Sequence, residues 1–297
     1  MKHRVSASDT PQVLGLDKYS APQWLAARAN RRFHVMAKPA GSACNLDCAY
    51  CFYLSKRVLP GGPGSGHMPD EVLERFVKDY IDSVTSDEVV FSWQGGEPTL
   101  LGLEFFEKVV TLQAKHAKPG QRIENDLQTN GTLLDDDWAR FLKQQRFLVG
   151  LSIDGPREIH DHCRITKHAE PTFDQVFAAA KMLQKHGVRF NTLTCVHRYN
   201  ASRPLDVYRF LRREIGSTYI QFIPIVEIRG FENMAPGTWD EAKLPMLGDP
   251  RCHPDHPESV VTPWSVAAEE YGYFLSKIWD EWQARDVGKV LVNLCET

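Results

Sequence analysis

The chain has 297 residues, of which 42% are hydrophobic and 25% are charged, a composition typical of globular proteins. That length suffices for one large α/β domain or for two smaller domains. The formal net charge is −3 and basic residues are spread along the chain, so the charge pattern does not favour nucleic-acid binding. No apolar run approaches the roughly 18 residues of a membrane-spanning helix, and residues 1–6 lack the apolar core of a secretory signal. We expect a cytoplasmic protein with no membrane or nucleic-acid partner.

Strand-like and helix-like segments alternate along the chain after a peripheral N-terminal segment, residues 1–32. Strand-like segments occupy residues 33–37, 88–93, 123–128, 147–153, 188–196 and 219–225, and most of them are the short apolar runs typical of buried parallel strands. Amphipathic helical patterns occupy residues 69–84, 103–118, 135–145, 172–186 and 204–214. This alternation predicts a parallel sheet with right-handed crossover connections.

Polar and glycine-rich segments follow the carboxyl ends of the first four predicted strands. They are residues 44–51, 94–98, 129–132 and 154–156. In a (β/α) barrel these strand ends form one face, where four loops converge more readily than on an open doubly wound sheet. We therefore predict an α/β fold with a partial (β/α)6 TIM-like barrel over residues 33–225.

Residues 226–297 differ from the barrel region in composition. Residues 226–263 are rich in Pro, Gly and His and predict an irregular linker, whereas residues 264–284 predict a long amphipathic helix. The last apolar stretch, residues 290–294, has no following segment to pack against. We expect an interrupted chain rather than a finished one.

The densest chemical signal is the run of Cys44, Cys48 and Cys51 within eight residues. Thiolates are soft donors that bind zinc or iron–sulfur clusters. A structural zinc or a ferredoxin-type cluster takes four protein ligands, so three cysteines would leave one iron of a four-iron cluster open for chemistry. The alternative is a zinc knuckle with a distant fourth ligand, Cys252 or His253. Seven cysteines in total, an odd number with three clustered, favour reduced thiols over a disulfide scaffold.

The remaining cysteines have simpler interpretations. Cys163, Cys195 and Cys295 are expected to be small buried hydrophobic residues. The segment 252–256 contains Cys252, His253 and His256, but it lies in the proline-rich linker, so we expect a loop rather than a metal site.

The second signal is Gly95-Gly96-Glu97-Pro98, directly after a predicted strand. Two glycines let the backbone approach a ligand closely, and Glu97 offers a carboxylate to an ammonium group. Tyr50, between the second and third clustered cysteines, is placed to shield a bound cluster.

The pattern Cys-x3-Cys-x-aromatic-Cys followed by Gly-Gly-Glu-Pro resembles the radical S-adenosylmethionine (SAM) superfamily. The resemblance implies a [4Fe–4S] cluster on Cys44, Cys48 and Cys51, with SAM chelated to the fourth iron. It also implies that Gly95, Gly96 and Glu97 help to bind the SAM amino group. One-electron reduction then cleaves SAM, and the resulting 5′-deoxyadenosyl radical abstracts a hydrogen atom from the substrate.

Four longer segments are similar to the anaerobic sulfatase-maturating enzymes within that superfamily. They are residues 44–53, 93–100, 127–132 and 149–156, and the similarity runs from about residue 33 to 225. The resemblance implies an oxidoreductase that converts a Cys or Ser of an unfolded sulfatase polypeptide to Cα-formylglycine. It further implies an electron donor such as ferredoxin or flavodoxin.

By position, the resemblance assigns further site residues. Ser152 and Arg164 would bind the SAM carboxylate and ribose region, although a capping serine and a surface ion pair are the plainer interpretations. The other cofactor-binding positions would be Tyr50, Tyr53 and Gln94. The expected substrate pocket comprises Gln128, Asn130, Asp154 and Gln221.

The sequence departs from that family at its C-terminal end. Sulfatase maturases have a cysteine-rich SPASM-type domain that holds two auxiliary clusters and an acidic residue proposed as the catalytic base. No such cysteine array precedes Thr297, so we expect the base to lie outside these residues. Two alternatives therefore stay open, namely another radical SAM peptide-modifying maturase and a truncated, inactive, regulator-like remnant.

Overall fold

The computed structural model describes residues 33–51, 53, 67–230, 245–246 and 248–295. The expected N-terminal segment 1–32 and the glycine-rich loop 59–66 lie outside the described residues. Within the described ranges, no helix has both the length and the apolar character needed to cross a membrane.

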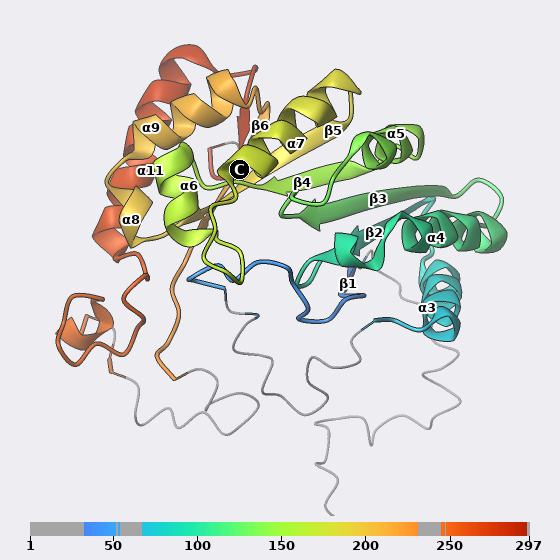
Figure 1. The fold of residues 1–297 in the computed structure, drawn as a ribbon, viewed down its shortest axis with the longest axis horizontal. Helices are drawn as coiled ribbons and strands as arrows, with labels where there is room; N and C mark the ends of the chain where they lie inside the picture. The colour runs from blue at the N-terminus through green and yellow to red at the C-terminus, as the bar shows by residue number, and fades with distance from the viewer. Residues whose placement is uncertain (1–32, 52, 54–66, 231–244, 247, 296–297) are drawn as a thin grey trace, which may run out of the picture.

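The core of the fold is a parallel sheet of seven strands that follow one another in chain order. The strands are β1 (Val35–Ala37), β2 (Glu88–Trp93), β3 (Arg122–Thr129), β4 (Leu148–Ser152), β5 (Arg189–Val196), β6 (Tyr219–Pro224) and β7 (Leu291–Val292). Figure 1 shows the strands side by side, with β1 at one edge. The strand order never reverses, whereas a doubly wound sheet reverses at a switch point. The predicted α/β class and partial barrel are confirmed, and the closed form of the barrel is excluded because the first and last strands do not pair.

Helices connect successive strands. The longer ones are α3 (Asp70–Ser83), α4 (Leu103–His116), α5 (Asp136–Gln144), α7 (Phe173–Lys185), α9 (Pro204–Arg209), which continues as the π-helical turn η4 (Phe210–Glu214), and α11 (Ala268–Arg285). The shorter ones are η3 (Pro98–Leu101), α6 (Arg157–Cys163), α8 (Arg198–Ala201) and η6 (Pro250–Cys252). At α5 the Asp135 side chain accepts a 2.9 Å hydrogen bond from the Trp138 amide, which explains why that helix begins there.

The apolar core lies between the sheet and these helices and consists of two clusters. The first joins β2 and β3 to α3, α4 and α5 through large residues such as Phe91, Trp93 and Phe106. The second joins β6 to α9 and α11 through residues such as Phe222 and Phe274. Because side chains alternate along a strand, burying these residues on the helical face leaves Ser92 and similar neighbours on the opposite face.

The seventh strand corrects the expectation for the C-terminal stretch. Residues 290–294 were expected to lack a partner, but Leu291 and Val292 pair with Tyr219 and Ile220 of β6. Val292 is fully buried, and the Trp282 indole donates a 2.7 Å hydrogen bond to the Val290 carbonyl. The helix that precedes the strand therefore fixes its position, a long-range effect that the sequence pattern does not contain.

Candidate active site

The three clustered cysteines lie in the loop that follows β1, at the carboxyl edge of the sheet. The thiols of Cys44, Cys48 and Cys51 are all free, and Cys48 is buried. Among the described residues, no three His, Cys, Asp or Glu side chains gather closely enough to hold a single metal ion.

The glycine pair after β2 packs against this cysteine loop. The Gly96 amide donates to the Gly41 carbonyl at 2.9 Å, and the Glu97 amide donates to the Ala43 carbonyl at 2.7 Å. A Cβ atom on Gly96 would lie 1.9 Å from the Ala43 oxygen, so only glycine fits. The close backbone approach predicted from the sequence is therefore present, and here it is made to the cysteine loop.

Glu97 joins the loops that follow β2 and β3. Its buried carboxylate accepts hydrogen bonds from the Thr99 amide at 3.0 Å, the Thr99 hydroxyl at 2.7 Å, the Thr129 hydroxyl at 2.8 Å and the Asn130 amide at 2.7 Å. Burial raises the pKa of Glu97, and these donors oppose that rise. Oxygen Oε2 accepts from Asn130 alone among the described residues, so it retains capacity for another donor.

Asn130 links the β3 loop to the first cysteine. Its amide nitrogen donates to Asn45 Oδ1 at 2.9 Å and lies 3.8 Å from Cys44 Sγ. The Leu46 amide also points at that sulfur, at 3.4 Å. Burial raises the pKa of the Cys44 thiol, while the Leu46 amide and Asn130 lower it by stabilising the thiolate. The sulfur therefore has donors that suit a thiolate ligand.

The other side of the cysteine loop is bound to residues 163–166, just after α6. The Asp47 amide donates to the Ile165 carbonyl at 2.8 Å, and the Ala49 amide donates to the Cys163 carbonyl at 2.9 Å. An antiparallel bridge between Leu46 and Thr166 extends this pairing. In Figure 1 the blue loop after β1 runs beside the segment that follows α6.

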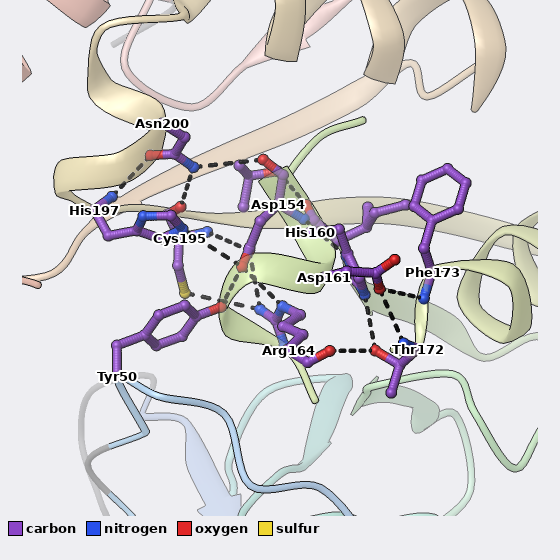
Figure 2. Close-up of polar contacts among 12 residues, drawn as sticks. Tyr50, Asp154, His160, Asp161, Arg164, Thr172, Phe173, Cys195, His197 and Asn200 are labelled. Atoms are coloured by element: carbon purple, nitrogen blue, oxygen red, sulfur yellow. Dashed lines mark hydrogen bonds and ion pairs between the residues drawn. The ribbon is translucent and has the colours of Figure 1, made fainter. Parts of the chain in front are cut away.

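A buried polar network lies behind that pairing and is shown in Figure 2. Arg164 donates to Asp154 through Nε at 3.0 Å and through Nη2 at 3.1 Å. The Tyr50 hydroxyl donates to Asp154 Oδ2, and the Cys195 amide donates to Oδ1 at 3.1 Å. Burial alone would raise the pKa of Asp154, but Arg164 and nearby histidines outweigh it and lower the pKa, so the carboxylate is ionised.

Three residues that sequence reasoning missed complete the network. Asn200 donates to the Cys195 carbonyl at 2.8 Å, and His160 lies 3.1 Å from the Thr172 hydroxyl. The His197 ring stacks on the Tyr50 ring, with centroids 5.3 Å apart. Its Nε2 is buried without a hydrogen-bond partner in the described part of the chain and lies 3.9 Å from Asp154 Oδ2. No local motif marks these residues: the cited hydrogen bonds of Asn200 and His160 span 5 and 12 residues, whereas the ring of His197 contacts Tyr50 in the cysteine loop.

The other predicted site residues make different contacts. Ser152 ends β4 and is buried, and Gln221 in β6 donates to the Tyr219 hydroxyl at 2.9 Å. The Lys38 ammonium lies 4.7 Å from the centre of the Tyr53 ring. The Gln94 backbone amide donates to the Ala37 carbonyl at 2.9 Å. Gln128 in β3 is the strand-pairing partner of Gly150 in β4. The structure thus brings Cys44, Glu97 and Asn130 together, and separately Tyr50, Asp154 and Arg164.

The fold and the site define a parallel α/β protein with three free thiols held at the carboxyl edge of its sheet. The family model described as the Radical SAM superfamily matches residues 39–211. The chain belongs to the radical SAM superfamily. Its cofactors are accordingly a [4Fe–4S] cluster and S-adenosylmethionine, as the sequence resemblance implied.

Two curated relatives and one solved structure are similar to this chain over most of its length. It is 41% identical over 264 residues to the serine-type anaerobic sulfatase-maturating enzyme of Bacteroides thetaiotaomicron, covering 89% of this chain and 60% of that one. It is 45% identical over 215 residues to the cysteine-type enzyme of Clostridium perfringens, covering 71% and 57%. A solved structure described as native anSMEcpe with bound AdoMet and Cp18Cys peptide has 36% identity and a TM-score of 0.71, covering 88% of this chain and 63% of its own. The chain spans less than two thirds of each relative's length.

Proposed function

We propose that this chain is the SAM-cleaving part of an anaerobic sulfatase-maturating enzyme, an oxidoreductase that converts a sulfatase Cys or Ser to Cα-formylglycine. The main support is its 41% identity to a serine-type maturase across 89% of its length. The similarity to a maturase solved with AdoMet and a peptide supports a polypeptide substrate. This modification is post-translational, and the proposed electron donor is ferredoxin or flavodoxin in the reducing cytoplasm. The proposed SAM-binding unit is residues 33–225.

The residues present fit an iron–sulfur cluster. Cys44, Cys48 and Cys51 would be its ligands, because they are free, share one loop and include a sulfur already approached by two N–H groups. Burial raises the pKa of Cys48 to about 12, so binding of iron must displace its proton. When bound, the cluster and SAM supply one-electron chemistry that begins with reductive cleavage of SAM.

Protein groups at the strand ends would orient SAM. Glu97 Oε2 would accept an ammonium donor of SAM, because among the described residues it accepts only the Asn130 amide, and the Gly95 and Gly96 backbone adjoins Glu97 in sequence. Ser152 and Arg164 would receive the carboxylate, since Arg164 uses only Nε and Nη2 for Asp154 and no hydrogen bond of Nη1 occurs within the described residues. Tyr50, Tyr53 and Gln94 would complete the cofactor pocket.

Two of the four predicted substrate-pocket residues are better assigned to another role. Asp154 has no exposed side-chain surface and already accepts from Tyr50, Arg164 and the Cys195 amide. Asn130 is likewise occupied by Asn45 and Thr132. We therefore assign Asp154 and Asn130 to holding loops in place. Gln128 and Gln221 remain the proposed pocket residues.

Anaerobic reconstitution followed by reduction with SAM present tests the proposal. We expect a brown protein with about four irons per chain, formation of 5′-deoxyadenosine, and an aldehyde in a peptide bearing Cys-x-Pro-x-Arg. C48S should abolish iron binding, whereas C163S, which changes a buried thiol outside the proposed ligand set, should retain it. A colourless protein with stoichiometric zinc would refute the cluster assignment. Deoxyadenosine without peptide aldehyde would refute sulfatase maturation by these residues alone.

A further inference from the structure

The cysteine loop is held from two opposite sides by groups far away in sequence. On one side Gly96 and Glu97 donate amide hydrogens to the carbonyls of Gly41 and Ala43, which precede the cysteines. On the other side the loop itself donates, from Asp47 to Ile165 and from Ala49 to Cys163. The hydrogen bonds donated by Asp47 and Ala49 lie among the cysteines, so they fix the positions of Cys48 and Cys51 more directly than the first pair does.

Tyr50 is placed to reinforce that second side. It lies between Cys48 and Cys51, and its side chain is 6% exposed. Its hydroxyl donates to Asp154 Oδ2, and the Arg164 guanidinium lies 5.6 Å from the ring centre. Figure 2 shows the ring reaching from the cysteine loop into the polar network. A buried hydrogen bond to an ionised carboxylate is stronger than one between neutral groups.

Asp154 is a rigid acceptor because several separate elements hold it. It follows β4, and Arg164 at the end of α6 and the Cys195 amide in β5 both donate to it. The same Arg164 stands between Cys163 and Ile165, whose carbonyls bind the cysteine loop. The contacts therefore close a ring from Tyr50 through Asp154 and Arg164 back to the loop.

We propose that Tyr50 and Asp154 are positioning residues that latch the cysteine loop and slow the loss of its iron–sulfur cluster. This inference rests on the proposed function only for the cluster. The latch itself is a property of the polypeptide. Without the hydroxyl, the loop opens more often from residues 163–166, and the ligands on either side of Tyr50 leave together.

The variant Y50F tests the latch, because it removes the hydroxyl and keeps the ring. Y208F is its matched control, since the fully buried Tyr208 hydroxyl donates to the Asp286 carboxylate at 2.8 Å in another part of the fold. Hydrogen–deuterium exchange is measured first on the metal-free chains. We expect peptides containing Asp47 and Ala49 to exchange about tenfold faster in Y50F, with β3 to β5 unchanged. Y208F should leave the cysteine loop at the wild-type rate.

Cluster retention is measured next on the reconstituted proteins, as the rate at which an iron chelator bleaches the cluster. We expect Y50F to bind wild-type iron but to lose it about tenfold faster, while Y208F loses it at the wild-type rate. Unchanged loop exchange in Y50F, or equal acceleration in Y208F, would overturn the latch. Faster exchange with unchanged bleaching would overturn its role in retention. Failure of every chain to take up iron would instead count against the proposed function, because the exchange experiment needs no cofactor.

Discussion

Substitution of Gly96 by alanine adds one atom, Cβ, where the glycine loop contacts the cysteine loop. The added Cβ would lie 1.9 Å from the Ala43 carbonyl oxygen, 2.5 Å from its carbon and 2.8 Å from the Ser42 carbonyl carbon. All three neighbours are backbone atoms, so no side-chain rotation relieves the clash. The two loops must separate by about 1 Å, which displaces the residue immediately before Cys44.

The cost of that separation follows from the contacts it disrupts. Two backbone hydrogen bonds, from Gly96 to Gly41 and from Glu97 to Ala43, contribute about 0.5–1.5 kcal/mol each. Overpacking in a rigid site adds about 1–3 kcal/mol. We therefore expect G96A to lower the free energy of unfolding by about 2–6 kcal/mol and to reduce iron uptake at Cys44.

Urea denaturation of the metal-free protein and iron analysis after reconstitution measure the two effects. G272A is the control, because a Cβ at Gly272 in α11 meets no atom within 4 Å. Replacing a helical glycine by alanine should stabilise the protein by about 1 kcal/mol and leave iron uptake unchanged. Wild-type stability together with full iron uptake in G96A would show that the loop contact does not hold the cysteines.

Three further predictions concern the buried polar groups. D154N leaves the Arg164 charge buried without its partner, so urea denaturation should show a free energy of unfolding lower by about 3–5 kcal/mol. R157Q is the control, because it breaks the exposed pair between Arg157 and Asp174 and should leave that free energy unchanged. T129V removes a hydroxyl donor to Glu97 and should lower the free energy of unfolding by about 1.5–3 kcal/mol in the same assay. An unchanged free energy would show that this hydrogen bond does not stabilise the protein. Burial and Arg164 lower the pKa of His160 to about 3, so protons bind the unfolded chain preferentially below the ordinary value of 6.5. The unfolding free energy should therefore fall by about 1.4 kcal/mol per pH unit as pH drops below about 6.5, and an unchanged slope in H160Q would refute this.

Local patterns predicted the sheet because the strand faces that pack against the helices are apolar. The apolar run 88–93 matches β2 at both ends, and the run 219–225 exceeds β6 by one residue. The short strand β7 was not predicted, since two residues carry no pattern and become a strand only by pairing with β6. Periodicity cannot encode such long-range pairing.

The candidate site likewise has a part that local sequence predicts and a part that depends on long-range contacts. The sequence predicted the cysteine loop because its three thiols lie within eight consecutive residues, and it predicted the glycine pair because the motif occupies four consecutive residues. The resemblance placed Asp154 in the substrate pocket, but its charge is balanced by an arginine ten residues later, and a tyrosine 104 residues earlier donates a hydrogen bond to it. Cys195 was expected to be a small buried hydrophobic residue, but it is only partly buried, and its backbone amide donates to that same carboxylate. Side-chain partners at such separations become visible only in three dimensions.

An open sheet has two unpaired edges, and both are short in the described part of this protein. β1 contributes three residues and β7 contributes two, whereas β3 and β5 inside the sheet contribute eight each. Few backbone amides and carbonyls are therefore available to recruit a strand from another molecule. The uneven strand lengths protect against edge-to-edge aggregation without requiring the barrel to close.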